Sequence, residues 1–114
     1  MTVQPDEAAP CVAVVTTTVG GEADAERLAG MVVARRLAAC VQACRIVSTY
    51  RWDGRVQREA EWRLDLKTTQ ARADALMAAL AEAHPYDEPE LVVTEVGTSV
   101  GYAAWVAAET VSGG

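Results

Sequence analysis

The sequence is poor in the groups that enzymes most often use. It contains one histidine, His84, and it has no glycine-rich phosphate loop, no G-x-S-x-G or H-E-x-x-H motif and no calcium-loop pattern. The common signatures of nucleotide binding, ester hydrolysis and metalloprotease activity are therefore missing. Little in the chain supports an enzyme.

Long apolar segments and an excess of basic residues are also lacking. The apolar runs are too short to cross a bilayer, and the N-terminal MTVQPDEAAP has no basic start followed by an apolar stretch. We therefore expect a cytoplasmic protein with no membrane association. The net charge of −6, from 16 acidic and 10 basic residues, repels phosphate backbones, so we expect no nucleic-acid partner.

Cysteine is scarce as well. Cys11, Cys40 and Cys44 are odd in number and have no C-x-x-C spacing. Without a secretory signal, this pattern indicates free thiols and not a disulfide framework or a zinc knuckle.

What the chain does contain is one globular domain. Its 114 residues are 51% apolar and 23% charged, and no polar or Pro/Gly-rich linker divides them. We expect a frayed N-terminus over residues 1–10, a single domain over 11–111 and a short tail over 112–114.

Hydrophobic periodicity and turn residues predict an α+β order of elements. The expected segments are a strand at 11–19, a helix at 22–39, strands at 40–52 and 55–67, a helix from Thr68 or Thr69 to His84, a strand at 89–96 and a helix at 102–111. Arg35 and Arg36 would lie near the end of the first helix, and Pro85 would end the second. The order β-α-β-β-α-β plus a terminal helix is the ferredoxin-like plan.

The two central strands are predicted to form a hairpin around Asp53-Gly54, a pair that suits a type I′ turn. In this register Trp52 faces Arg55 and Cys40 faces Lys67. One face of the hairpin would pack on the helices: Val41, Ala43, Val47, Ala60, Trp62, Leu64 and Leu66. The other mixes aromatic, thiol and charged side chains, Glu61 among them.

The length of this hairpin points to an oligomer. Each arm has about 13 residues, or roughly 43 Å of strand, which a domain of this size cannot cover. Tyr50 and Trp52 near its tip would then need a partner. We expect a homo-oligomer.

The sequence allows two interpretations of His84, one structural and one as a metal ligand. At a helix C-terminus it can satisfy free carbonyl groups, which is the commoner role. It can also bind a divalent ion together with Asp87, Glu88 and Glu90, which follow within one turn. Cys40 is likewise a small buried thiol by default, or a thiolate favoured by Lys67.

Several segments together resemble one family, CutA, the divalent-cation tolerance proteins. They are RLAACV, YRWDGRVQREAEWRLDLKT, HPYDEPEL and YAAW, in the family's order, and the resemblance runs from about Val12 to Val111. It implies a ferredoxin-like subunit in a homotrimer similar to the PII proteins, with a role in tolerance of copper and other divalent cations. It implies no enzymatic activity.

The resemblance also nominates site residues. His84 of HPY and Cys40 of LAAC match candidate copper ligands, and Glu61 joins them as a metal candidate. Lys67, Tyr50, Trp52 and Tyr86 are expected to line the cleft between subunits. Some bacterial members have a cysteine where this chain has Thr17, and a second histidine where it has Ala83, so a soft-metal site built from all these groups is incomplete here.

Two other functions stay open at this point. A PII-like regulator would bind a small anion or nucleotide in the intersubunit clefts, with Lys67 and arginines as contacts. A thiol enzyme would need Cys40 and His84 within hydrogen-bond reach of each other.

Overall fold

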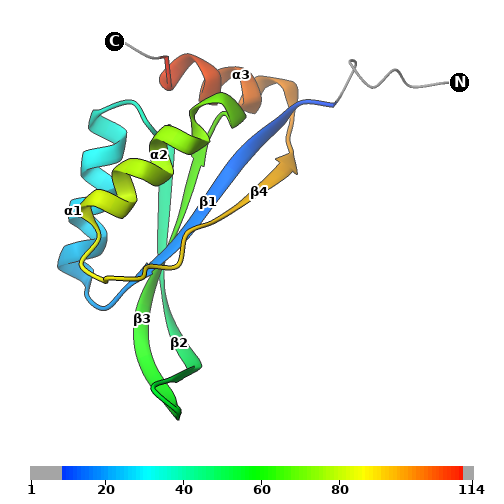
Figure 1. The fold of residues 1–114 in the computed structure, drawn as a ribbon. Helices are drawn as coiled ribbons and strands as arrows, with labels where there is room; N and C mark the ends of the chain where they lie inside the picture. Colours follow the sequence, from blue (N-terminus) through cyan, green and yellow to red (C-terminus); the bar gives the residue numbers. More distant parts are fainter. Residues whose placement is uncertain (1–8, 112–114) are drawn as a thin grey trace, which may run out of the picture.

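A computed structural model describes residues 9–111 (Figure 1). The sheet consists of β1 (Cys11–Val19), β2 (Cys40–Trp52), β3 (Arg55–Thr68) and β4 (Val92–Gly97), and the helices are α1 (Glu22–Ala34), α2 (Gln70–Ala83) and α3 (Val100–Glu109). The strands are antiparallel in the order β2-β3-β1-β4. The ferredoxin-like plan is confirmed, while the terminal segments 1–8 and 112–114 lie outside the described residues. Within 9–111 no helix has the length and apolar character needed to cross a membrane.

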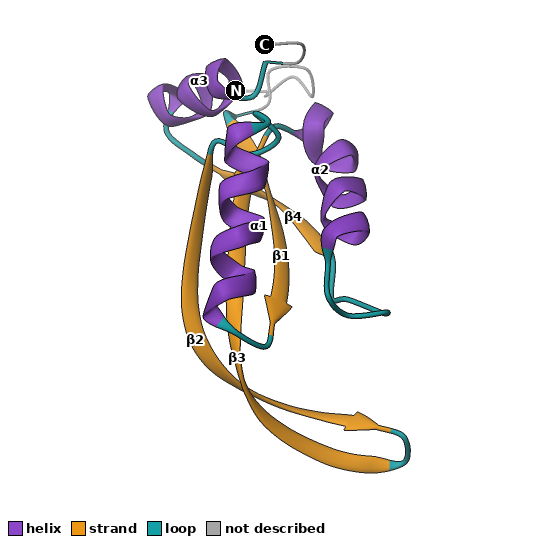
Figure 2. Cartoon of the chain, turned by 90° about the vertical axis from the view of Figure 1, so that its left-hand side faces the viewer, coloured by secondary structure: helices purple, strands orange, loops and turns teal. Residues whose placement is uncertain are grey.

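The core lies between one face of the sheet and helices α1 and α2 (Figure 2). Alternate residues of β1 and β3 point to this side, so Val15 and Leu66 are fully buried against Leu28 and Leu76 of the helices. Leu64 and Leu66 therefore confirm the predicted inner face of the hairpin. On helix α3, Val106 is fully buried but lies outside this cluster, whereas Trp105 is 44% exposed.

One helix boundary differs from the prediction and another agrees with it. Helix α1 ends at Ala34 and not near residue 39, because Arg36 takes a left-handed backbone conformation with φ 59° that no helix can continue. Helix α2 begins as predicted after Thr69, whose side chain accepts a hydrogen bond from the backbone N–H of Arg72.

The β2–β3 hairpin has the predicted register, from Cys40 opposite Lys67 to Trp52 opposite Arg55. Asp53 and Gly54 have φ values of 52° and 74°, as a type I′ turn requires. The arms continue well beyond α1 and α2, as Figure 2 shows. Packing of Ala43, Val47 and Ala60 on the helices was a wrong prediction: the register gives them the predicted face, but all three side chains are exposed, Val47 to 59%.

Candidate functional site

His84 is the residue that ends α2, and its ring is held against β1. Its backbone is extended, with φ −71° and ψ 139°, as expected before Pro85. The ring Nε2 lies 3.0 Å from the Thr18 carbonyl oxygen and 3.1 Å from Thr17 Oγ1. Strand β4 pairs with β1 only as far as Thr16, so His84 hydrogen-bonds to the part of the β1 edge that β4 leaves uncovered.

These contacts define the hydrogen-bonding state of the imidazole. A carbonyl oxygen only accepts, so Nε2 carries the proton, and Nδ1 accepts the backbone N–H of Tyr86 at 3.0 Å. Burial lowers the pKa of His84, against smaller opposing effects from the Thr18 carbonyl, Asp24 and Glu61. The ring is thus a neutral bridge between β1 and the segment that follows α2.

From the end of a helix His84 satisfies a carbonyl group, as predicted, but that carbonyl belongs to Thr18 of β1 and not to α2. The Ala83 carbonyl accepts a hydrogen bond from the Arg27 guanidinium instead. The extended backbone at His84 turns its ring away from the helix end and toward β1. Arg27 thus joins α1 to the end of α2, and His84 joins α2 to β1.

Tyr86 reaches the other side of the sheet. Its hydroxyl donates to Glu61 Oε2 at 2.8 Å. Glu61 lies on the face opposite Leu64, so the segment from His84 to Tyr86 passes around the edge of β1. Burial and the neighbouring Glu61 carboxylate strongly raise the pKa of the Tyr86 phenol, which keeps it a proton donor.

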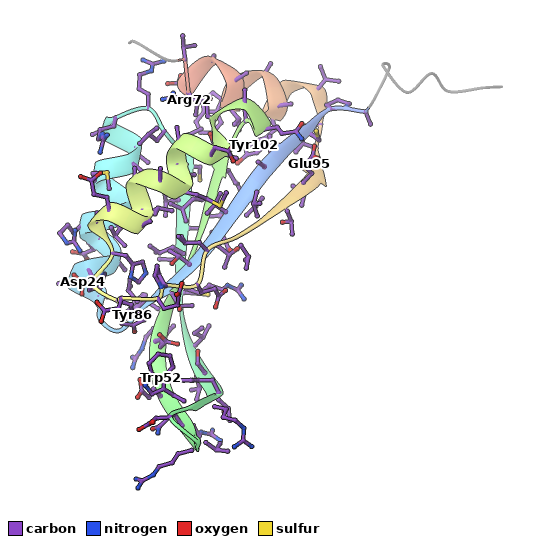
Figure 3. All side chains as sticks on the ribbon, in the orientation of Figure 1. Asp24, Trp52, Arg72, Tyr86, Glu95 and Tyr102 are labelled. Carbon is purple, nitrogen blue, oxygen red and sulfur yellow. The ribbon has the colours of Figure 1, made fainter. Side chains whose placement is uncertain are left out.

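A groove of about 770 Å³ opens where this segment meets the hairpin. It is lined by Thr18, Ser48, Thr49, Tyr50, Trp52, Gln57, Glu59, Glu61, Tyr86, Asp87, Glu88 and Glu90. Five of these side chains are carboxylic acids, three are aromatic and none is basic. Figure 3 shows Tyr86 at the base of the hairpin and Trp52 further along it. The groove therefore attracts cations and repels anions.

Three of the residues expected at a subunit cleft, Tyr50, Trp52 and Tyr86, line this groove, as does Glu61. Glu59 was not singled out from the sequence, although it shares a hairpin face with Glu61. The alternation of the strand could have indicated it. The approach of residues 86–90 to that face had no local signal, because it depends on how far β4 extends along β1.

Cys40 and Lys67 lie elsewhere on the sheet. They face each other across β2 and β3, and the Lys67 ammonium hydrogen-bonds to Gln42. Cys40 neighbours Tyr102 of α3. Burial, and to a smaller extent the contact with Cys40, raises the pKa of the Tyr102 phenol.

Within one subunit the structure does not bring Cys40 to His84. Lys67 pairs with Val14, three residues along β1 from Thr17, and Cys40 lies a further strand away. The distance is roughly 10 Å along the strands and 10 Å across them. The contact that a thiol enzyme requires is therefore not made in one subunit. Among residues 9–111 no three His, Cys, Asp or Glu side chains are grouped closely enough to hold a metal ion.

Fold and groove together define a class: a small α+β sandwich with a long projecting hairpin and an acidic, aromatic groove at the hairpin's base. A sequence model of the family described as CutA1 divalent ion tolerance protein matches residues 13–109. The chain belongs to this family.

Individual relatives agree with this assignment. The divalent-cation tolerance protein CutA of Citrobacter koseri is 38% identical over 103 residues, which cover 89% of this chain and 90% of that protein. The chloroplastic protein CutA 1 of rice is 38% identical over 95 residues, covering 82% of this chain; the match spans only 54% of the rice protein. The structure of CutA from Synechococcus elongatus superposes with a TM-score of 0.86 at 38% identity, covering 90% of this chain and 93% of that one.

Proposed function

We propose that this protein binds divalent cations, copper among them, as cargo in a cation-tolerance process, and that it catalyses no reaction. The supporting observation is the groove, which is lined by five carboxylates and no basic side chain and therefore attracts cations. No three potential ligands among residues 9–111 are close enough to hold a metal ion, so further ligands would come from a neighbouring subunit. Carboxylate oxygens are ligands for divalent cations. The relatives are named for divalent-cation tolerance and not for an enzymatic activity, which supports the same conclusion.

Glu61, His84 and Cys40 are the proposed metal ligands, with different requirements. Glu61 already faces the groove. His84 can offer Nδ1 to a metal only if the backbone N–H of Tyr86 releases it. Cys40 would have to come from a neighbouring subunit, because in its own subunit it lies away from His84. Copper favours such nitrogen and sulfur ligands, so His84 and Cys40 are proposed as ligands for copper in particular.

The proposed assembly is a homotrimer, supported by the surfaces that one subunit leaves uncovered. The hairpin extends the molecule to 52 Å, and Trp52 and Val56 on it are 62% and 66% exposed. Strand β4 is a sheet edge whose Val92 and Val93 are about half exposed. Both features invite pairing with another copy. Sedimentation equilibrium should give three times the subunit mass, and a monomer would contradict this part of the proposal.

The proposed compartment is the cytoplasm. All three cysteines are free, which fits a reducing environment. The PII-like alternative gains no support, because the acidic groove repels the anion it requires and Lys67 does not line it.

Copper titration by calorimetry tests the ligand assignments. Replacing Glu61 by Gln, His84 by Ala or Cys40 by Ser should each weaken copper binding by at least about tenfold, the loss of one charged or coordinating contact. The matched controls are Glu82→Gln on the exposed side of α2 and Cys44→Ser on β2. If the three site variants bind copper as the controls do, the assignment is wrong.

A further inference from the structure

We propose that Gly20 is a positioning residue for Glu61 and acts through Tyr86. Gly20 leaves open the space in which the Tyr86 hydroxyl reaches the Glu61 carboxylate, and that hydroxyl orients the carboxylate for a cation in the groove. This inference rests on the proposed function, because it treats Glu61 as a ligand for a divalent cation. It adds the two residues that hold this ligand in place.

Space, and not backbone conformation, is what requires glycine at position 20. Gly20 directly follows β1, and among residues 9–111 the only glycine with a positive φ is Gly54. The backbone at Gly20 is therefore open to other residues. A Cβ atom there would lie 3.3 Å from the Tyr86 hydroxyl oxygen, tighter than most contacts of a real Cβ atom. No other heavy atom beyond the adjoining residues lies within 4 Å of it.

Tyr86 has little freedom to move away from an added methyl group. Its backbone N–H donates to His84 Nδ1 at 3.0 Å, and its hydroxyl donates to Glu61 Oε2 at 2.8 Å. Pro85 restricts the backbone just before it. Since Tyr86 is held at both ends, a methyl group at position 20 displaces the hydroxyl from Glu61.

The hydrogen bond from Tyr86 decides which oxygen of Glu61 is available. Glu61 is only 8% exposed, and it lines the groove. Tyr86 occupies Oε2, whereas no hydrogen bond to Oε1 is present in the described part of the chain. Oε1 is therefore the oxygen that the cation takes. Metal-binding carboxylates are commonly oriented by such a hydrogen bond, and its loss lowers metal affinity by about 10- to 100-fold.

Two substitutions separate the clash at Gly20 from other effects of alanine. Gly20→Ala brings a methyl group against the hydroxyl, and Tyr86→Phe removes the only atom listed above as close to that methyl group. Without a clash, replacing glycine by alanine normally stabilises a protein, because alanine has less freedom in the unfolded chain. We therefore expect Gly20→Ala to lower the urea midpoint of the wild type and to raise that of Tyr86→Phe.

The matched control is Gly21→Ser. It adds a side chain at the next residue, where nothing lies within 4 Å of a Cβ atom, and serine suits this N-cap position of α1. Its urea midpoint should be no lower than that of the parent protein in both backgrounds.

Cation binding is measured by calorimetric titration of Mn²⁺ into the full-length protein in its own assembly state. Mn²⁺ prefers carboxylate oxygen and does not require the nitrogen of His84. We expect Gly20→Ala and Tyr86→Phe each to weaken binding by at least about tenfold, with no further loss when they are combined. Gly21→Ser should bind like the wild type.

The positioning role of Gly20 is overturned if Gly20→Ala lowers the urea midpoint in both backgrounds or in neither, or if it binds Mn²⁺ as the wild type does. If the urea midpoints follow the expected pattern and the wild type binds no Mn²⁺, Gly20 and Tyr86 still position Glu61. In that case only the proposed binding of divalent cations at Glu61 fails.

Discussion

Replacing Tyr86 by Phe removes one oxygen atom and, with it, the hydrogen bond to Glu61. A hydrogen bond to a charged group contributes about 1.5–3 kcal/mol when buried. Tyr86 is 36% exposed, so water can partly replace the lost donor. We therefore expect the free energy of unfolding to fall by about 1–2 kcal/mol. For a chain of this size, this lowers the melting temperature by roughly 4–8 °C.

Urea denaturation at neutral pH measures this loss, provided the protein concentration is held fixed because assembly also stabilises the fold. The effect should depend on Glu61. In a Glu61→Gln background, which leaves only a neutral acceptor, Tyr86→Phe should cost about half as much or less. A loss below about 0.5 kcal/mol, or an equal loss in both backgrounds, would refute the view that this contact fixes the segment after α2.

Three further outcomes are expected. Because burial lowers the pKa of His84, the unfolded state binds more protons than the folded one; stability should be full above the ordinary histidine value of about 6.5 and fall as the pH drops below it. A urea midpoint in His84→Gln that follows the same pH dependence would contradict this. Thr17→Cys places a thiol beside His84 Nε2 and not beside Nδ1, the nitrogen proposed to bind metal, so calorimetry should give the same copper affinity as for Thr17→Ser; a higher affinity would show that Nε2 is the coordinating atom. Thr69→Ala removes the N-cap of α2 and should lower stability by about 1 kcal/mol in thermal melts, while Thr69→Ser should retain most of it.

The hairpin was predictable because its determinants are local. Asp53-Gly54 selects the turn, the turn fixes the register, and the register assigns every side chain to a face. The outcome at Val47 shows the limit of this reasoning. Alternation gives the side of the sheet on which a residue lies, but its coverage depends on where the helices end in space.

The groove was less predictable for the same physical reason. Its walls join β3 to a segment more than 20 residues later, and their meeting depends on β4 pairing no further along β1 than Thr16. The left-handed backbone of Arg36, which ends α1 early, is likewise set by tertiary contacts: its guanidinium binds the Ala108 carbonyl of α3, and its own carbonyl accepts from Arg72. Local propensity cannot report such contacts.

The position of His84 changes how its part in metal binding must be judged. Its Nδ1 holds the backbone of Tyr86, and the hydroxyl of Tyr86 holds Glu61. Removing the imidazole therefore disturbs the groove even if no metal ever touches the ring. A direct ligand must exchange the Tyr86 N–H for the metal, which displaces Tyr86 from Glu61 on binding, whereas a positioning residue keeps both contacts. Loss of copper affinity in His84→Ala is common to both roles, and the fate of the Tyr86–Glu61 hydrogen bond on metal binding is what separates them.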